Sequence, residues 1–175
     1  MVAHTLVVGG TGMLSGLCEA LAGDGGRLSL LSRHASHAAG ADGFDCDYHD
    51  GSSFSAALDA AIARSGPIDR AVAWFHTLKI EAPRLLAARV EGAMFQVLGS
   101  AVADPAHSER LETARRVAEG LPRCAVRQIV LGFRVEAGRA RWLTNAEISQ
   151  GALEAIRSDR LLTVIGQTEP WSARP

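Results

Sequence analysis

The sequence predicts an α/β fold, a single three-layer domain in which helices cover both faces of a doubly wound, mostly parallel sheet. Short apolar β-type runs alternate with segments of helical periodicity along the 175 residues, which is how parallel βαβ units are built. Hydrophobic residues make up 47% of the chain, enough to bury a core without disulfides or a metal. We expect the strand order 3-2-1-4-5-6 with one further strand.

Seven strands are expected, at 5–8, 28–31, 44–47, 70–75, 94–98, 126–133 and 161–165. Helices are expected at 13–22, 53–64, 82–90 and 108–119, where apolar residues recur every three or four positions. Residues 136–139 predict a turn that leads into a short strand near Trp142. Thr144 and Glu147 have the spacing of a capping box for a last helix through Ile156.

Composition excludes several classes of function. The formal net charge of −1 gives no field that would gather nucleic acid or an anionic membrane, so neither partner is expected. The three cysteines form no CxxC pair and no His/Cys cluster, so we expect no disulfide framework and no metal site. No signal-peptide pattern or long apolar span is found, which predicts a cytoplasmic protein. Arginine far outnumbers lysine, as is typical of a GC-rich bacterial gene.

The most informative stretch is 6–16, an apolar strand followed by a glycine-rich turn and a helix start. A pyrophosphate needs glycines where the chain turns sharply and where the backbone approaches it, and its charge then lies against free N–H groups at the helix N-terminus. Gly9 and Gly12 stand at those positions. The context favours a dinucleotide-binding domain of the Rossmann type over residues 1–175, and the alternative is a structural turn without a ligand.

The stretch Gly9-Gly10-Thr11-Gly12-Met13-Leu14 resembles the GxxGxxG-type turn of the short-chain dehydrogenase/reductase superfamily, in particular of its small atypical members. The resemblance extends through the last strand, and Ser15 replaces the third glycine as the next smallest residue for close helix–strand packing. It implies that Gly9, Thr11, Gly12, Met13 and Leu14 hold the phosphates of NAD(P).

The same resemblance assigns the remaining cofactor residues. Ser32 and Arg33 end the second strand, where relatives that prefer NADP place an arginine against the 2′-phosphate; this implies NADP(H) rather than NAD(H), although an ordinary surface arginine is the alternative. Asp47 stands where relatives hydrogen-bond the adenine amino group, with Tyr48 beside that pocket. Ala73 and Trp74, at the end of the fourth strand, lie near the nicotinamide.

The catalytic pattern of the superfamily is missing. Typical members protonate with a tyrosine whose acidity a lysine four residues later maintains, but the chain's only tyrosine is Tyr48, its only lysine is Lys79, and 112–117 contains neither. Only Ser100 resembles the family's serine position. His76 becomes the candidate acid/base because imidazole titrates near neutral pH. The alternative is a histidine that only completes the strand end.

Two functions stay open. The first is an NADP(H)-dependent oxidoreductase acting on a small carbonyl, imine or flavin-type acceptor without the Tyr/Lys pair; the second is a non-catalytic dinucleotide sensor or interaction module. Most of the superfamily's substrate loop is absent between Phe133 and Asn145, so any substrate is small or held by a partner subunit. Relatives commonly dimerise through their fourth and fifth helices, which leaves a homodimer open. His34, His37 and His49 are assigned no role.

Overall fold

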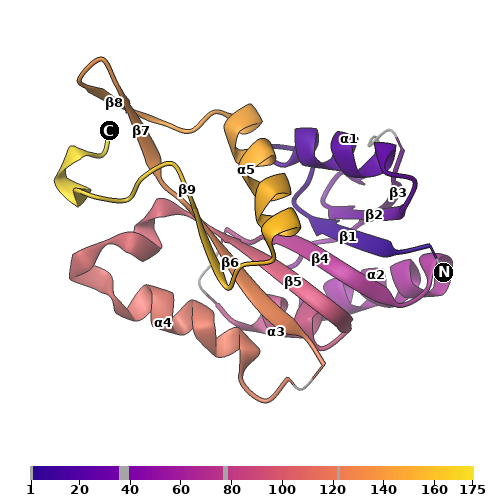
Figure 1. Cartoon of the computed structure of the whole chain (residues 1–175). Coiled ribbons are helices and arrows are strands. Elements are labelled where there is room, and N and C mark those ends of the chain that lie inside the picture. Colours follow the sequence, from indigo (N-terminus) through magenta and orange to yellow (C-terminus); the bar gives the residue numbers. More distant parts are fainter. Residues whose placement is uncertain (1, 36–39, 77–78, 122) are drawn as a thin grey trace.

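The computed structural model describes residues 2–35, 40–76, 79–121 and 123–175, and a seven-stranded sheet forms its centre (Figure 1). The strand order is β3-β2-β1-β4-β5-β6-β9, and every pairing is parallel. The expected order 3-2-1-4-5-6 is confirmed, and the further strand, β9, pairs with β6. The strands are β1 (His4–Val8), β2 (Arg27–Ser32), β3 (Asp42–Asp45), β4 (Ile68–Trp74), β5 (Val90–Leu98), β6 (Ala125–Leu131) and β9 (Leu162–Ile165).

Helices cover both faces of the sheet, as the sequence predicts (Figure 1). On one face lie α1 (Ser15–Gly23) and α5 (Asn145–Ser158); on the other lie α2 (Gly51–Ser65), α3 (Glu81–Ala87) and α4 (Glu109–Arg115). The described residues also include short 3-10 turns: η2 (Ser100–Ala103), η3 (Pro105–His107), η4 (Arg116–Ala118) and η5 (Trp171–Ala173). Among the described helices, none has the length and apolar character needed to cross a membrane.

The strand β1 is buried along its whole length. Leu6 and Val8 belong to the apolar cluster under α2 and α3, whereas Val7 belongs to the cluster under α1 and α5. A strand that is covered on both faces by helices needs apolar residues at successive positions and not in alternation. The run Leu6-Val7-Val8 therefore fixes β1 at the middle of the three layers, with β2 on one side and β4 on the other.

The fifth strand begins earlier than the sequence predicts. It starts at Val90, four residues before the expected Met94, so the preceding helix ends at Ala87 and not at 90. Gly92 explains the difference, since a Cβ at this position would stand 2.2 Å from the carbonyl oxygen of Asp69. The register between β4 and β5 shifts at the same place. A glycine inside this strand marks a close backbone approach and not an interruption.

Three other differences concern where an element ends, while most remaining bounds shift by one or two residues. The expected strand 126–133 divides at Gly132, where a Cβ would stand 2.2 Å from the carbonyl oxygen of Gln167, and the chain continues as a separate strand. The expected helix 108–119 ends as α4 at Arg115 and tightens into η4. The third strand ends at Asp45, so Asp47 follows the strand and is not part of it.

The separate strand forms an antiparallel hairpin that projects beyond the sheet (Figure 1). It consists of β7 (Phe133–Glu136) and β8 (Arg139–Trp142), and its two turn residues, Ala137 and Gly138, both have positive φ. Such values match the twist of a two-residue hairpin turn. The turn expected at 136–139 and the short strand near Trp142 are confirmed.

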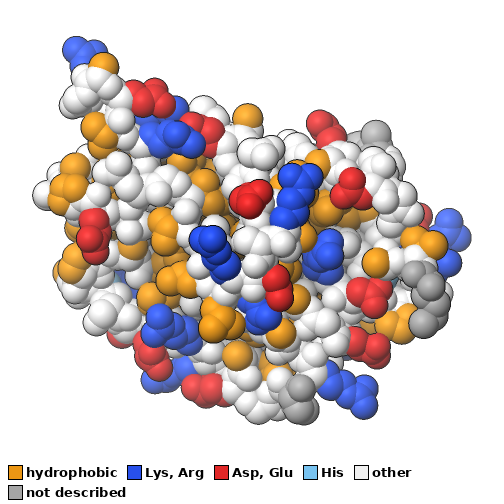
Figure 2. Space-filling model, in the orientation of Figure 1, with side chains coloured by type: hydrophobic (Ala, Val, Ile, Leu, Met, Phe, Trp, Pro, Cys, Tyr) orange, Lys and Arg blue, Asp and Glu red, His pale blue; other side chains and the backbone are white. Residues whose placement is uncertain are grey.

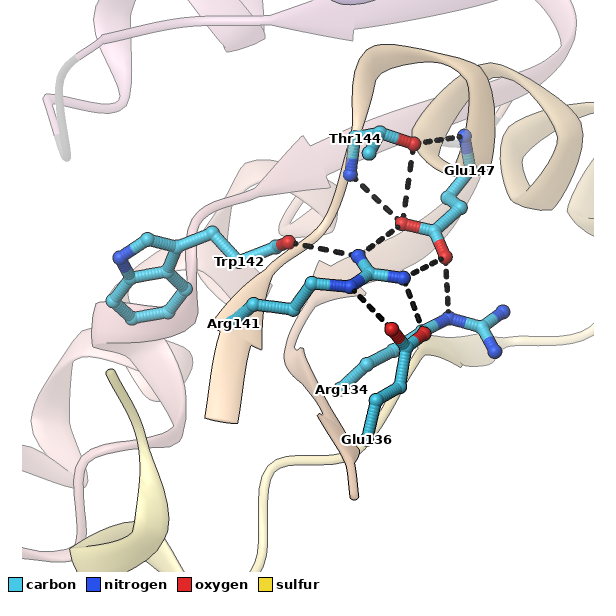
Figure 3. Close-up of polar contacts among 6 residues, drawn as sticks. All are labelled: Arg134, Glu136, Arg141, Trp142, Thr144 and Glu147. Carbon is cyan, nitrogen blue, oxygen red and sulfur yellow. Dashed lines mark hydrogen bonds and ion pairs between the residues drawn. The ribbon is translucent and has the colours of Figure 1, made fainter. Parts of the chain in front are cut away.

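A polar network ties the hairpin to the start of α5 (Figure 3). The Thr144 hydroxyl accepts from the Glu147 backbone N–H at 3.2 Å, and the Glu147 carboxylate accepts from the Thr144 N–H at 2.8 Å, which confirms the capping box. Arg141 donates to the carboxylates of both Glu136 and Glu147, and Arg134 pairs with Glu147 at 2.7 Å. The bonds from Arg141, followed by those from Thr144, lower the pKa of Glu147 to about 2.

This lowered pKa predicts an acid-sensitive contribution to stability. The ordinary pKa of the Glu147 carboxyl is 4.5, so its stabilising effect is complete above that pH and is lost as the pH falls to about 2. In Glu147→Gln the melting temperature falls at pH 7, and the difference from wild type shrinks between pH 4.5 and 2, as thermal unfolding across this range measures. Glu154→Gln, on an exposed turn of the same helix, serves as control. A difference that stays constant with pH would contradict the assignment.

Candidate functional site

A cleft of about 550 Å³ opens at the carboxyl ends of β1, β2, β3 and β4. This is the place where the strand order reverses, because β1 pairs with β2 on one side and with β4 on the other. Open α/β sheets bind ligands at such a switch point. The cleft is lined by Gly9, Thr11, Gly12, Met13, Leu31, Ser32, Arg33, His34, Asp47, Tyr48, His49, Trp74 and His76.

The turn from β1 to α1 forms one wall of the cleft, and each of its glycines meets a different requirement. Gly9 has a φ of 79°, and its N–H donates to the Leu31 carbonyl at 3.0 Å. A Cβ on Gly10 would stand 2.5 Å from Cδ1 of Leu30, whereas a Cβ on Gly12 would have no atom within 4 Å. Gly9 thus permits the turn, Gly10 permits close packing, and Gly12 leaves the backbone open to the cleft.

The N-terminus of α1 is suited to an anion. Its cap residue Leu14 makes no side-chain capping hydrogen bond, and the first turn carries no acidic side chain. The first N–H groups of a helix lack partners within the helix and lie at the positive end of its dipole. An anionic group in the cleft would supply the missing acceptors.

The expected packing role of Ser15 is wrong. Its side chain is exposed, and the close approaches to other elements occur at Gly10 and Gly16 instead. A Cβ on Gly16 would stand 3.2 Å from Cβ of Ser149 in α5, and the Ser149 hydroxyl donates to the Met13 carbonyl at 3.0 Å. The glycine that brings the helices together is one position further along, and α5 supports the turn.

Residues that follow β2 and β3 form the outer end of the cleft. Oδ1 of Asp47 accepts hydrogen bonds from the His49 backbone N–H and ring Nδ1, both at 2.9 Å. These bonds, together with the nearby charge of Arg33, hold the pKa of Asp47 below its ordinary value. The outer end therefore presents the guanidinium of Arg33 beside the Asp47 carboxylate, whose Oδ2 accepts no hydrogen bond from the described residues.

Trp74 and His76 form the inner end. The indole Nε1–H of Trp74 donates to Nε2 of His76 at 2.7 Å, and the backbone N–H of His76 donates to the hydroxyl of Tyr48 at 3.1 Å. Indole is only a donor, so this bond requires Nε2 without a proton and places the proton of the neutral ring on Nδ1. Tyr48 extends from the outer end to the inner end and does not lie only beside the outer one.

The structure brings most of the expected site residues together. Gly9, Thr11, Gly12, Met13, Ser32, Arg33, Asp47, Tyr48, Trp74 and His76 all line the cleft. Leu14 and Ala73 are fully buried behind it and are not among the lining residues.

Sequence reasoning gave no role to three residues that line the cleft: Leu31, His34 and His49. Their positions at or just after the ends of β2 and β3 were the available signal. His37 lies outside the described residues. Among the described residues, no group of three or more His, Cys, Asp or Glu side chains could hold a metal ion.

Solved structures share this architecture. A short-chain dehydrogenase/reductase from Serratia marcescens superposes with a TM-score of 0.70 at 13% identity, over 94% of this chain and 96% of its own. Aldohexose dehydrogenase from Thermoplasma acidophilum gives 0.68 at 11%, over 94% and 92%, and a short-chain dehydrogenase from Streptomyces avermitilis gives 0.69 at 14%, over 95% and 89%. The chain has the short-chain dehydrogenase/reductase fold.

The similarity is one of structure and not of sequence. No protein-family model matches the chain. No curated protein matches it in sequence either. The superpositions on solved structures confirm, for the fold, the resemblance inferred from the glycine turn. The chemistry must be argued from the residues of the cleft.

The glycines of the turn predict contrasting stabilities. Gly10→Ala forces a methyl group against the buried Leu30 and Cys18, and overpacking of this kind costs about 1–3 kcal/mol. Gly12→Ala adds a methyl group to open space and leaves the free energy of unfolding unchanged. Urea unfolding of the two variants measures the difference. Equal stabilities would show that the β1–α1 packing is not as described.

Proposed function

We propose that the protein is a compact, atypical short-chain dehydrogenase/reductase that binds NADP(H) in this cleft. The observation that carries the proposal is that groups suited to each part of the adenine half line one cleft at the switch point. The β1–α1 turn and the N-terminus of α1 suit the pyrophosphate, and Arg33 suits the 2′-phosphate. Oδ2 of Asp47 suits the adenine amino group. An acid in place of Arg33 would favour NAD(H) instead.

We further propose that the protein is an oxidoreductase whose acceptor is a small carbonyl, imine or flavin-type molecule. The nicotinamide supplies the hydride chemistry, and the protein supplies orientation and a proton. His76 is the acid/base that we assign, since it lies at the inner end of the cleft and its neutral ring carries a proton on Nδ1. Residues 109–118, which form α4 and η4, offer no tyrosine–lysine pair for this role.

One observation favours a non-catalytic sensor or interaction module as the second candidate. Trp74 engages Nε2 of His76, which withholds one of the two imidazole nitrogens from a substrate. A panel of small carbonyl, imine and flavin acceptors separates the candidates. An oxidoreductase oxidises NADPH with at least one acceptor, whereas a sensor binds both redox forms and turns over neither.

Small molecules are the partners that we propose, and nucleic acid and membranes are not. Figure 2 shows acidic and basic side chains interspersed over the face in view, without a broad area of one sign. Such a surface does not concentrate polyanions. A cytoplasmic location and a homodimer stay predictions, and size-exclusion chromatography with light scattering tests the latter.

The role of Arg33 predicts a cofactor-selective effect. A hydrogen bond to a charged group contributes about 1.5–3 kcal/mol, so Arg33→Asp raises the Kd for NADPH by about tenfold to a hundredfold. The Kd for NADH changes little, because NADH has no 2′-phosphate. Calorimetric titration measures both constants, and Arg139→Asp in the hairpin is the matched control. An equal loss for both cofactors would remove the assigned role.

The role of His76 predicts a loss of turnover without a loss of binding. General acid–base groups typically contribute about a hundredfold to ten-thousandfold in rate, so kcat with an identified acceptor falls by that order in His76→Ala. The Kd for NADPH does not rise, because the bond that His76 makes to Trp74 is not needed for the cofactor to bind. His107→Ala, on the exposed turn η3, is the control. Unchanged kcat in His76→Ala would refute the acid/base assignment.

A further inference from the structure

The cleft is formed unevenly across the two halves of the fold. A doubly wound sheet offers one mononucleotide-binding half after β1 to β3 and a second half after β4 to β6. Among the described residues, the second half contributes only Trp74 and His76 to the lining, both from the end of β4. Gly99 and Ser100 follow β5 directly but do not line the cleft.

The indole of Trp74 explains why the second half does not open. A Cβ on Gly9, after β1, would stand 3.7 Å from Cδ1 of Trp74, and a Cβ on Gly99, after β5, would stand 3.3 Å from Cη2. Cδ1 and Cη2 lie at opposite ends of the indole. The ring therefore lies across the carboxyl ends of β1, β4 and β5, where a nicotinamide would lie in a bound dinucleotide.

Two contacts hold the ring in this position. Its Nε1–H donates to Nε2 of His76 at 2.7 Å, and its apolar part packs against the core cluster under α1 and α5. The rings of Trp74 and His76 meet edge to face, with centroids 5.0 Å apart. Moving the indole costs the hydrogen bond and part of this packing.

We propose that Trp74 closes the nicotinamide half of the site, so that the cleft as formed accepts only the adenosine 2′-phosphate and pyrophosphate half of the cofactor. The proposal rests on NADP(H) being the ligand. Entry of the nicotinamide displaces the indole, and this displacement breaks the bond to His76 and frees Nε2. Cofactor binding and the release of an imidazole nitrogen are thus one event, and Trp74 acts as a positioning residue for His76.

Two ligands that differ only in the nicotinamide test the proposal. They are NADPH and 2′-phospho-ADP-ribose, each titrated calorimetrically into the full-length protein. NADPH binds only the open form, in which the indole is displaced, so its apparent affinity falls in proportion to the fraction of molecules in that form. A ring that is closed in about nine-tenths of the molecules weakens the binding of NADPH about tenfold. Trp74→Ala therefore strengthens NADPH binding about tenfold and leaves 2′-phospho-ADP-ribose binding unchanged.

Trp142→Ala is the matched control. Trp142 is 48% exposed on the hairpin, is not part of the cleft lining, and its ring points away from the polar network that anchors the hairpin (Figure 3). The same truncation there leaves both affinities unchanged. Trp74→Phe keeps an aromatic ring but removes the indole donor, so it gives an intermediate gain for NADPH even if Trp74→Ala folds poorly.

Fluorescence gives an independent readout. In a Trp142→Phe/Trp171→Phe background, Trp74 is the only tryptophan. NADP⁺ shifts its emission as the ring moves, whereas 2′-phospho-ADP-ribose does not. Equal effects of Trp74 substitution on both ligands, or emission that saturating NADP⁺ leaves unchanged, would overturn the closure while NADP(H) binding stands. Failure of both ligands to bind wild type and Trp74→Ala would overturn the proposed function and the closure with it.

Discussion

The complete burial of β1 is the constraint on which the site depends. Both faces of this strand are covered and both edges are paired, and the chain must turn sharply at its carboxyl end so that α1 can pack on one face of the sheet. Gly9 makes that turn with a positive φ, and Gly10 lets the following helix pack directly on Leu30. The same strand separates the two winding directions of the sheet, so the turn opens into the crevice between them.

Sequence patterns within single strands and helices were sufficient to predict several features of the fold. The parallel sheet followed from the alternation of apolar runs, and the capping box of α5 from Thr144 and Glu147 alone. The strand order followed from the doubly wound fold that the glycine turn after the first strand indicated. The early start of β5 and the break after β6 depend instead on how closely Gly92 and Gly132 approach the carbonyl oxygens of Asp69 and Gln167. Those partners are distant in sequence, and a glycine in a strand does not reveal what it approaches.

The candidate site shows the same division. Residues at strand ends could be identified because parallel strands bring their carboxyl ends to one edge, and most of them line the cleft. The sequence could not show that Tyr48 reaches His76, that Trp74 fixes the tautomer of His76, or that Leu14 and Ala73 lie behind the lining. Each of these depends on side-chain direction, which strand periodicity specifies only as one face or the other.

The cleft combines an end that is suited to an anionic ligand with an inner end whose groups bind one another. The glycine turn, the uncapped helix and Arg33 stand ready for an anionic ligand, whereas the indole and imidazole are joined by a hydrogen bond. An enzyme of this fold without the tyrosine–lysine pair must obtain its proton elsewhere. We propose that His76 supplies it, since its ring holds a proton on Nδ1 and Nε2 can take up a second one once Trp74 is displaced. The same arrangement would let a sensor register occupancy through the Trp74 ring.

Calorimetric titration of the purified wild-type protein with NADPH, and separately with NADH, at physiological salt and without substrate, decides whether the cleft holds a dinucleotide. We expect a 1:1 isotherm with NADPH, much weaker binding of NADH, and loss of both in Gly12→Val, which we expect to fold because a Cβ at this position meets no atom within 4 Å. No heat with either cofactor, together with no shift in melting temperature, would contradict the dinucleotide site and leave a ligand-free interaction domain of this fold.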